Sequence, residues 1–250
     1  MEEFEKEEIM EGVKKHLEYV EQKFPQLKVL GIFVIGSQNY GLSLQTDEYR
    51  SNLDTVVIVQ TEEGFDGLKT IKYGDDDHIS ICVYNWFYHS LYVGSNDMVE
   101  ALFTEFREIE DDRLDILIEN ADRIAAIDKY RILYGIVGHV IYQCQTIAIN
   151  MPHIDKPVYN LFRLYVFARD LYYGVPYRGA LYPESIDAKI LIDIKTGKFS
   201  EVNDISLQKF AEEIKASAIN LLKQIEEHVD DFTIDTSAYD ILDEFKKQFN

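Results

Sequence analysis

The sequence predicts an α+β protein, in which a small mixed sheet with flanking helices precedes a helical C-terminal part. Short apolar runs that are rich in β-branched residues, typical of buried strands, occur around 28–35, 54–60 and 78–84. From about residue 113 onward the pattern is helical instead. We therefore expect an α/β core over residues 1–112 and a helical domain over residues 113–250 that packs on the core.

The chain is expected to begin with a helix over 5–23. Its apolar residues lie close to helical spacing, and Pro25 ends the pattern. Two further helices are expected after the third strand, at 86–93 and 96–103. The helices of the C-terminal part are expected at 122–149, 156–173, 207–228 and 239–249, with breaks at Met151-Pro152-His153 and Gly174-Val175-Pro176.

Composition favours a protein that does not bind nucleic acid in general. The 250 residues are 46% hydrophobic, which is enough for a sizeable core. Against 25 Lys and Arg residues stand 45 Asp and Glu residues, which gives a net charge of −20. Such a surface repels a phosphate backbone.

Cysteine and histidine usage predicts neither a disulfide framework nor a zinc site. Cys82 and Cys144 lie in apolar surroundings and are interpreted as reduced core thiols. The six histidines show no metal-binding spacing. No apolar run approaches the length of a membrane span, and the start Met-Glu-Glu-Phe-Glu is too acidic for a signal peptide. We expect a cytoplasmic protein without a membrane partner.

The most informative segment joins the first two predicted strands. The apolar run 30–35 breaks at Gly36 and Ser37, and the next apolar run opens directly after Asp54. Glycine permits a tight turn and leaves room for a ligand to approach the backbone. Free amides at such a turn, together with the Ser37 hydroxyl, suit a phosphate. Asp54 suits Mg²⁺, because this ion needs only one or two protein carboxylates in addition to phosphate oxygens.

These residues resemble a known family. Gly-Ser-Gln-Asn-Tyr-Gly-Leu at 36–42 and Ser-Asn-Leu-Asp-Thr at 51–55 look like the nucleotidyltransferase fold of the DNA polymerase β superfamily. The likeness is greatest to predicted nucleotidyltransferases of bacteriophage and bacterial genomes, in which a Gly-Ser turn precedes an Asp-x-Asp pair on the next strand. Segments 95–104, 156–164 and 190–199 also look like family segments, so the likeness covers most of residues 28–225.

The resemblance implies a nucleoside triphosphate as ligand and Mg²⁺ as cofactor, with Mn²⁺ as the alternative ion. Asp54 and Asn52 would be the catalytic and metal-binding residues. The nucleotide would contact Gly36, Ser37, Tyr40, Lys156 and Arg163.

One departure from the family pattern affects the metal site. Asn52 stands where the family has its first metal carboxylate. Its amide oxygen can bind a cation but contributes no negative charge. Because two-metal phosphoryl transfer depends on shared carboxylates, this substitution should weaken at least one ion. Asp47 and Glu48, in the long loop before Asn52, are candidate replacement ligands.

A third carboxylate is expected from the strand at 78–84. His78, Ser80 and Cys82 alternate there with apolar residues, and no carboxylate lies within the run. Three aspartates at 75–77 directly precede it, and Asp77 is the predicted third ligand. The alternative is that Gly74 and these aspartates form only an acidic hairpin turn.

Basic residues in the helical part are candidates for triphosphate binding. Lys156, Tyr159, Asn160 and Arg163 recur at spacings that place them on one helix face. Lys156 and Arg163 would bind phosphates if that face points at the Gly36 turn. Otherwise the residues form a solvated or salt-bridged stripe. Lys195 and Lys198 are further candidates to face the cleft, and the alternative is that these residues around Gly197 form a turn.

Two functions remain open from the sequence. The first is an active nucleotidyltransferase that moves a nucleoside monophosphate from the triphosphate to a hydroxyl acceptor on RNA, a protein or a small molecule. The second is a pseudoenzyme: a nucleotidyltransferase-fold binding module that sequesters a nucleotide or inhibits a host protein. A bacteriophage product would act in the host cytoplasm.

Overall fold

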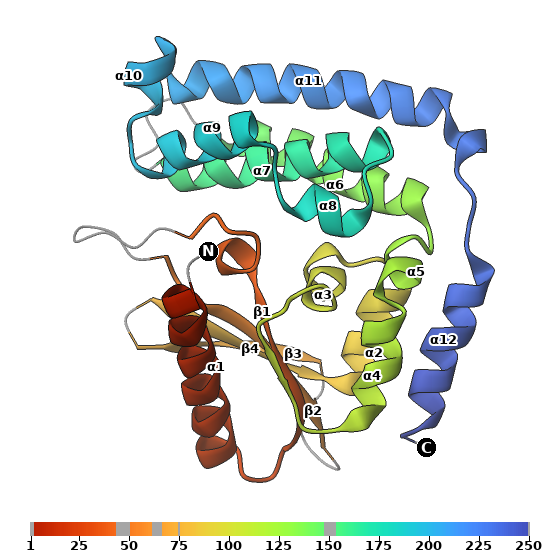
Figure 1. The fold of residues 1–250 in the computed structure, drawn as a ribbon. Coiled ribbons are helices and arrows are strands. Elements are labelled where there is room, and N and C mark those ends of the chain that lie inside the picture. The colour runs from red at the N-terminus through yellow and green to blue at the C-terminus, as the bar shows by residue number, and fades with distance from the viewer. Residues whose placement is uncertain (1–2, 44–50, 62–66, 75, 148–153, 250) are drawn as a thin grey trace. The chain divides into compact units, whose positions relative to one another are not determined.

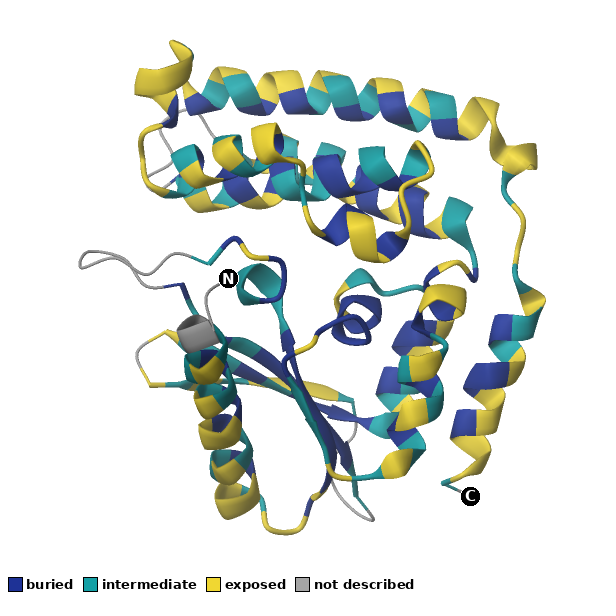
Figure 2. Ribbon diagram, viewed as in Figure 1, coloured by how far each residue is buried: buried dark blue, intermediate teal, exposed yellow. Residues whose placement is uncertain are grey.

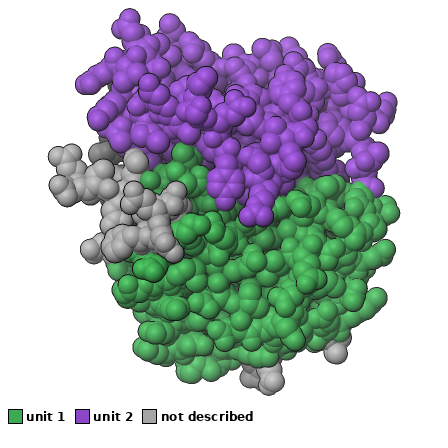
Figure 3. All heavy atoms as spheres, viewed as in Figure 1, with its two compact units in different colours: residues 1–127, 235–250 green, residues 128–234 purple. Residues whose placement is uncertain are grey.

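The computed structural model describes residues 3–43, 51–61, 67–74, 76–147 and 154–249. It divides into two compact units, which Figure 3 shows in different colours. Unit 1 comprises residues 1–127 and 235–250, and unit 2 comprises residues 128–234. These limits differ from the expected 1–112 and 113–250, because segment 113–127 and the C-terminal helix both pack in the α/β unit.

Unit 1 is built on a five-stranded mixed sheet, which confirms the predicted α+β class. The strand order is β3-β4-β2-β1-β5. Strand β1 runs antiparallel to β2 and β5, β2 runs parallel to β4, and β3 runs antiparallel to β4. Three strands were predicted and two were not. The strands are β1 (Lys28–Ile35), β2 (Asp54–Gln60), β3 (Leu68–Tyr73), β4 (Asp77–Val83) and β5 (Arg107–Ile109).

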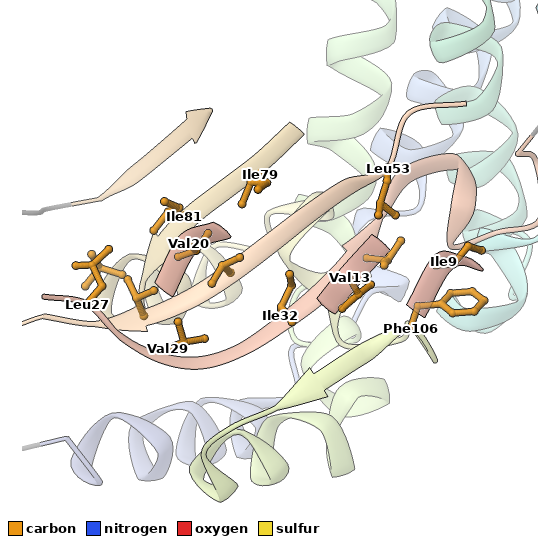
Figure 4. Close-up of a cluster of buried hydrophobic side chains, with 14 residues drawn as sticks. Ile9, Val13, Val20, Leu27, Val29, Ile32, Leu53, Ile79, Ile81 and Phe106 are labelled. Atoms are coloured by element: carbon orange, nitrogen blue, oxygen red, sulfur yellow. The ribbon is translucent and has the colours of Figure 1, made fainter. Parts of the chain in front are cut away.

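Helix α1 (Glu3–Lys23) covers one face of the sheet. Its buried residues Val13 and Val20 pack into a cluster with apolar side chains from the strands, as Figure 4 shows. Ile79 and Ile81 of β4 belong to this cluster, as the period-2 pattern of 78–84 predicted. Burial of such side chains contributes roughly 1.5–3 kcal/mol each, so this face anchors α1 to the sheet.

The other face of the sheet carries several shorter helices (Figure 1). Helix α2 contacts β2 and β4, and α3 contacts β1. Helix α12 contacts α2, α4 and α5, and the Arg113 guanidinium lies 3.9 Å from the centroid of the Phe249 ring. These contacts hold the C-terminal segment in unit 1. The helices are α2 (Tyr84–Tyr92), α3 (Asn96–Ala101), α4 (Asp115–Glu119), α5 (Ala121–Ala125) and α12 (Thr236–Lys247), and short 3₁₀ segments occur at η1 (Gly36–Gln38) and η2 (Asp112–Leu114).

Unit 2 is helical. Helices α6, α7 and α11 pack against one another, and Figure 2 shows buried residues recurring along one side of α11. Arg169 of α7 donates to Asp187 of α9 at 2.8 Å and to Asp170 at 2.7 Å. The elements are α6 (Lys129–Thr146), α7 (Asp155–Tyr172), α8 (Tyr177–Leu181), α9 (Ser185–Lys195), α10 (Phe199–Asn203), α11 (Leu207–Glu227) and the 3₁₀ segment η3 (Val229–Asp231).

The helix expected at 122–149 is two helices, α5 and α6. The chain breaks between them, and the Asp128 side chain caps α6 by accepting from the Arg131 amide at 2.9 Å. Aspartate favours such a cap position over a helix interior. The expected break at Met151-Pro152-His153 lies outside the described residues.

Both cysteines are free thiols. Cys82 is fully buried in β4, and this burial raises the pKa of its thiol to about 12. Cys144 is partly buried, and burial also raises its pKa. Over the residues that the structure describes, no helix has both the length and the apolar character needed to cross a membrane.

Candidate functional site

The Gly36 turn and Asp54 lie side by side in unit 1. Strands β1 and β2 are antiparallel, and their register pairs Ile35 with Asp54. The last residue of β1 therefore lies opposite the first residue of β2. A Cβ atom added to Gly36 would lie 3.5 Å from Asp54 Oδ2. A backbone turn and a carboxylate are thus brought together by strand pairing alone.

The turn itself is a short 3₁₀ segment that requires glycine at its first position. Gly36 has φ +78°, a conformation that costs other residues roughly 1–2 kcal/mol. The Asn39 amide donates to the Gly36 carbonyl at 2.9 Å, and the Leu42 amide donates to the Ser37 carbonyl at 3.0 Å. The buried Tyr40 places its hydroxyl 4.0 Å from the Cβ position of Gly36. Ser37 is partly exposed, as a ligand-binding hydroxyl requires.

A buried carboxylate from α3 accepts a hydrogen bond from one of the backbone amides of the turn. The Gly36 amide donates to Glu100 Oε1 at 2.6 Å, and Asn39 Nδ2 lies 3.5 Å from the same oxygen. The Gly36 amide is therefore not among the free amides of the turn. In the sequence, Glu100 belongs to the family-like segment 95–104, and no local pattern there indicates its contact with a turn 64 positions earlier.

His78 is the second residue at the site that sequence reasoning left without a role. The parallel register of β2 and β4 pairs Asp54 with His78. His78 Nδ1 lies 3.1 Å from Asp54 Oδ1, within hydrogen-bond distance. The side chains are 41% and 40% exposed, so solvent reaches this pair. One oxygen of Asp54 therefore faces His78, and the other faces Gly36.

The Asp77 side chain does not lie beside the Asp54 carboxylate. The Leu53 amide donates to Asp77 Oδ1 at 2.7 Å, and Asp77 Oδ2 lies 3.7 Å from Nε2 of the buried His16 on α1. His16 Nδ1 is also 3.0 Å from Thr55 Oγ1. Because successive side chains of a strand point to opposite faces, Asp77 and Thr55 face α1, whereas Asp54 faces the other side.

The contacts of Asp77 favour the hairpin alternative, and its role as the third metal ligand stays a prediction. Strands β3 and β4 form an antiparallel pair in which Tyr73 lies opposite Asp77, with Gly74 at φ +59° in the turn. Asp75 lies outside the described residues.

A Mg²⁺ ion that arrives with a triphosphate needs only one or two oxygen ligands from the protein. Asp54 offers a carboxylate, and Asn52, partly buried just before β2, offers an amide oxygen. Mg²⁺ binds in this manner, with phosphate oxygens and water as further ligands. Across the described ranges, no group of three or more His, Cys, Asp or Glu side chains is placed to hold a metal ion. Two ions would have to share carboxylates, and among the described residues no such group is found. Asp47 and Glu48 lie outside the described residues.

The predicted basic residues belong to unit 2. On α7, Lys156 and Asn160 are exposed and Arg163 is partly exposed. Tyr159 is buried instead, with Lys195 Nζ 5.2 Å from the centroid of its ring. The exposed face predicted for these residues therefore excludes Tyr159. The role of Lys156 and Arg163 in nucleotide binding stays a prediction.

Lys198 is exposed and directly precedes α10, and the preceding Gly197 has φ +72°. This conformation supports the turn interpretation of Lys198.

Comparisons with known proteins give little further guidance. No family model matches the chain, and no curated protein matches it. Among solved structures, the chain is similar to a nucleotidyltransferase-like protein from Exiguobacterium sibiricum 255-15, whose crystal structure has a resolution of 1.90 Å. The two share 12% identity with a TM-score of 0.33, over 86% of this chain and 75% of the other. At these values the likeness supports no assignment.

The structural position of Asp77 predicts that it stabilises unit 1. Replacing Asp77 with Ala should lower the free energy of unfolding by about 1–3 kcal/mol, because the buried partners lose their acceptor. The control is Asp76→Ala, because Asp76 is exposed. Its ion pair with Lys72, at 3.9 Å, is also exposed and contributes about 1 kcal/mol at most. Urea unfolding followed by circular dichroism measures both. A stable Asp77→Ala protein that has lost affinity for Mg²⁺ would instead make Asp77 a ligand.

Proposed function

We propose that the protein binds a nucleoside triphosphate with Mg²⁺ at the Gly36 turn and transfers the nucleoside monophosphate to a hydroxyl acceptor. The observation that supports this proposal is the placement of the Gly36 turn against the Asp54 carboxylate. Phosphoryl transfer requires little more than donors for the phosphates, a carboxylate for the cation and a fixed geometry. Mn²⁺ would serve as an alternative ion.

Each residue of the turn has a distinct proposed role. The Ser37 hydroxyl and the amides of Ser37 and Gln38 bind the β- and γ-phosphates, and Tyr40 borders them. Asp54 and the Asn52 amide oxygen hold the cation, which, when bound, neutralises charge on the phosphates. The acceptor oxygen forms a bond to the α-phosphorus, the bond to pyrophosphate breaks, and the hydroxyl proton passes to solvent. An RNA, protein or small-molecule hydroxyl fits this scheme equally.

The charge of the site makes the cation necessary for binding. Asp54 and Glu100 both place carboxylates at the turn, and the chain carries a net charge of −20. A triphosphate without a cation is therefore repelled, and at distances near 4 Å this repulsion amounts to about 1–4 kcal/mol for each pair of charges. We expect affinity for the triphosphate to depend strongly on Mg²⁺.

A second candidate function is a pseudoenzyme that binds the nucleotide without reacting it, or that inhibits a host protein. The position of Asp77 favours this candidate, because the carboxylate expected to complete the metal site faces α1 instead. Asn52 adds no charge, and His78 already contacts Asp54. One carboxylate suffices to bind a cation with a nucleotide, whereas two-ion catalysis requires more.

Nucleotide binding is tested by calorimetry with each of the four triphosphates, with and without Mg²⁺. Wild type should bind at least one of them when Mg²⁺ is present. Gly36→Val should abolish binding, because a branched side chain at φ +78° distorts the turn. Gly74→Val is the matched control, since Gly74 has φ +59° in the β3–β4 turn and its added Cβ would meet nothing within 4 Å.

The control variant Gly74→Val should have backbone strain similar to that of Gly36→Val, but it should bind the nucleotide as wild type does. Thermal unfolding of both variants checks that each is folded. Wild type that shows no affinity at millimolar triphosphate would contradict the proposal.

Catalysis is distinguished from binding alone by two substitutions next to the turn. If the site is active, Asn52→Asp should tighten Mg²⁺ binding and raise turnover, because a second full charge is added. Asp54→Ala should remove activity entirely. In a binding module, Asn52→Asp would be neutral or harmful, since two carboxylates would repel each other.

Pyrophosphate release, measured for wild type and both variants with candidate acceptors, separates these cases. Wild-type activity that survives Asp54→Ala unchanged would show that the site is wrongly assigned.

A further inference from the structure

The contact between Glu100 and the Gly36 turn joins two distant segments of unit 1. Glu100 lies near the end of α3 and is only 2% exposed. Its Oε1 atom accepts from the Gly36 amide at 2.6 Å and lies 3.5 Å from Asn39 Nδ2. These two nitrogens stand at the two ends of the turn. One buried oxygen therefore lies close to nitrogen atoms at both ends of the turn.

A buried carboxylate in this position is costly unless it has a specific use. Removing a charged group from water costs several kcal/mol, which hydrogen bonds only partly offset. A well-packed apolar side chain of similar volume would often stabilise the fold as well or better. What an apolar residue cannot do is accept from the Gly36 amide. An ionised carboxylate accepts from an amide about twice as strongly as a neutral acceptor does.

The surroundings of Glu100 keep its carboxylate in place. Its neighbours on α3, Met98, Val99 and Ala101, are buried, and α3 contacts β1, the strand that leads into the turn. Withdrawal of Glu100 would therefore disturb a packed helix. While the Gly36 amide donates to Glu100, a phosphate at the turn has to be bound by the Ser37 hydroxyl and the amides of Ser37 and Gln38.

We infer that Glu100 is a positioning residue, whose carboxylate holds the Gly36 turn in its nucleotide-binding conformation beside Asp54. The orientation of the Gly36 peptide determines where the following amides point, and this orientation is set by the bond to Glu100. The effect on nucleotide affinity rests on the proposed function, whereas the effect on the turn does not. This role requires no contact between Glu100 and the ligand.

The experiment compares wild type with Glu100→Ala and Glu100→Gln in the full chain. Glu105→Ala and Glu105→Gln are matched controls, because Glu105 lies close in sequence but is 54% exposed and pairs with Lys6 at 2.9 Å. Thermal unfolding checks that each variant is folded. Two further readouts are the amide resonance of Gly36 in ¹H–¹⁵N spectra and the affinity for ATP with Mg²⁺ by calorimetry.

In Glu100→Ala, the Gly36 amide proton should move upfield, as a proton does when it loses a strong acceptor, and affinity should fall by about tenfold or more. Glu100→Gln keeps a neutral acceptor oxygen, so both changes should be smaller. This partial rescue distinguishes positioning from a general loss of packing. Both Glu105 variants should match wild type.

The inference is overturned if the Gly36 resonance does not move in Glu100→Ala, or if that variant binds ATP as tightly as wild type or more tightly. Tighter binding would mean that Glu100 competes with the phosphate for the Gly36 amide. If Glu100→Ala does not fold, the same criteria apply to Glu100→Gln. Wild type that binds no nucleotide would overturn the proposed function and the affinity effect together, and the Gly36 resonance would still decide whether Glu100 fixes the turn.

Discussion

The register between β1 and β2 is the constraint on which the candidate site depends. It pairs Ile35 with Asp54, so Gly36 leaves β1 where Asp54 enters β2. A slip of one residue would turn the Asp54 side chain toward α1. There the carboxylate would meet the apolar cluster around Val13, at a large desolvation cost. The apolar face that α1 covers therefore specifies the register of β1 and β2. This register places the Asp54 carboxylate next to Gly36.

Three acidic side chains near these strand ends have different roles, which their surroundings determine. Asp77 faces α1 and accepts from the amide of Leu53. Glu100 accepts from the amide of Gly36 on the other side of the sheet. Together they hold the end of β1 and the start of β2. Asp54, which lies between these two points, is half exposed and has one oxygen directed at Gly36. Of the three, Asp54 is therefore the side chain that solvent reaches most readily.

The sequence predicted the central strands well because their apolar runs are dictated by burial on both faces of the sheet. Strand β3 was missed because it lies at the sheet edge with mostly exposed side chains, so no apolar run marks it. Strand β5 has only three residues, too few for a periodic pattern. The inclusion of α12 in unit 1 was also missed, since helical periodicity shows that a helix forms and not what it packs against.

The candidate site was predictable in part for the same reason. Gly36 and Asp54 are signalled locally, by a glycine that ends one apolar run and an acidic residue that opens the next. His78 reaches Asp54 only through the parallel pairing of β2 with β4. Glu100 reaches Gly36 only through the packing of α3 on β1. Contacts of this kind depend on topology, and a single sequence carries no local pattern for them.

The central claim is that Asp54 and the Gly36 turn together bind a cation and a triphosphate. The most direct measurement is the anomalous diffraction of crystals grown with Mn²⁺ and a non-hydrolysable ATP analogue. We expect a manganese peak at the Asp54 carboxylate, with the phosphates on the Ser37 hydroxyl and on the amides of Ser37 and Gln38. A manganese peak or triphosphate elsewhere on the chain, with the Gly36 turn bare, would contradict it.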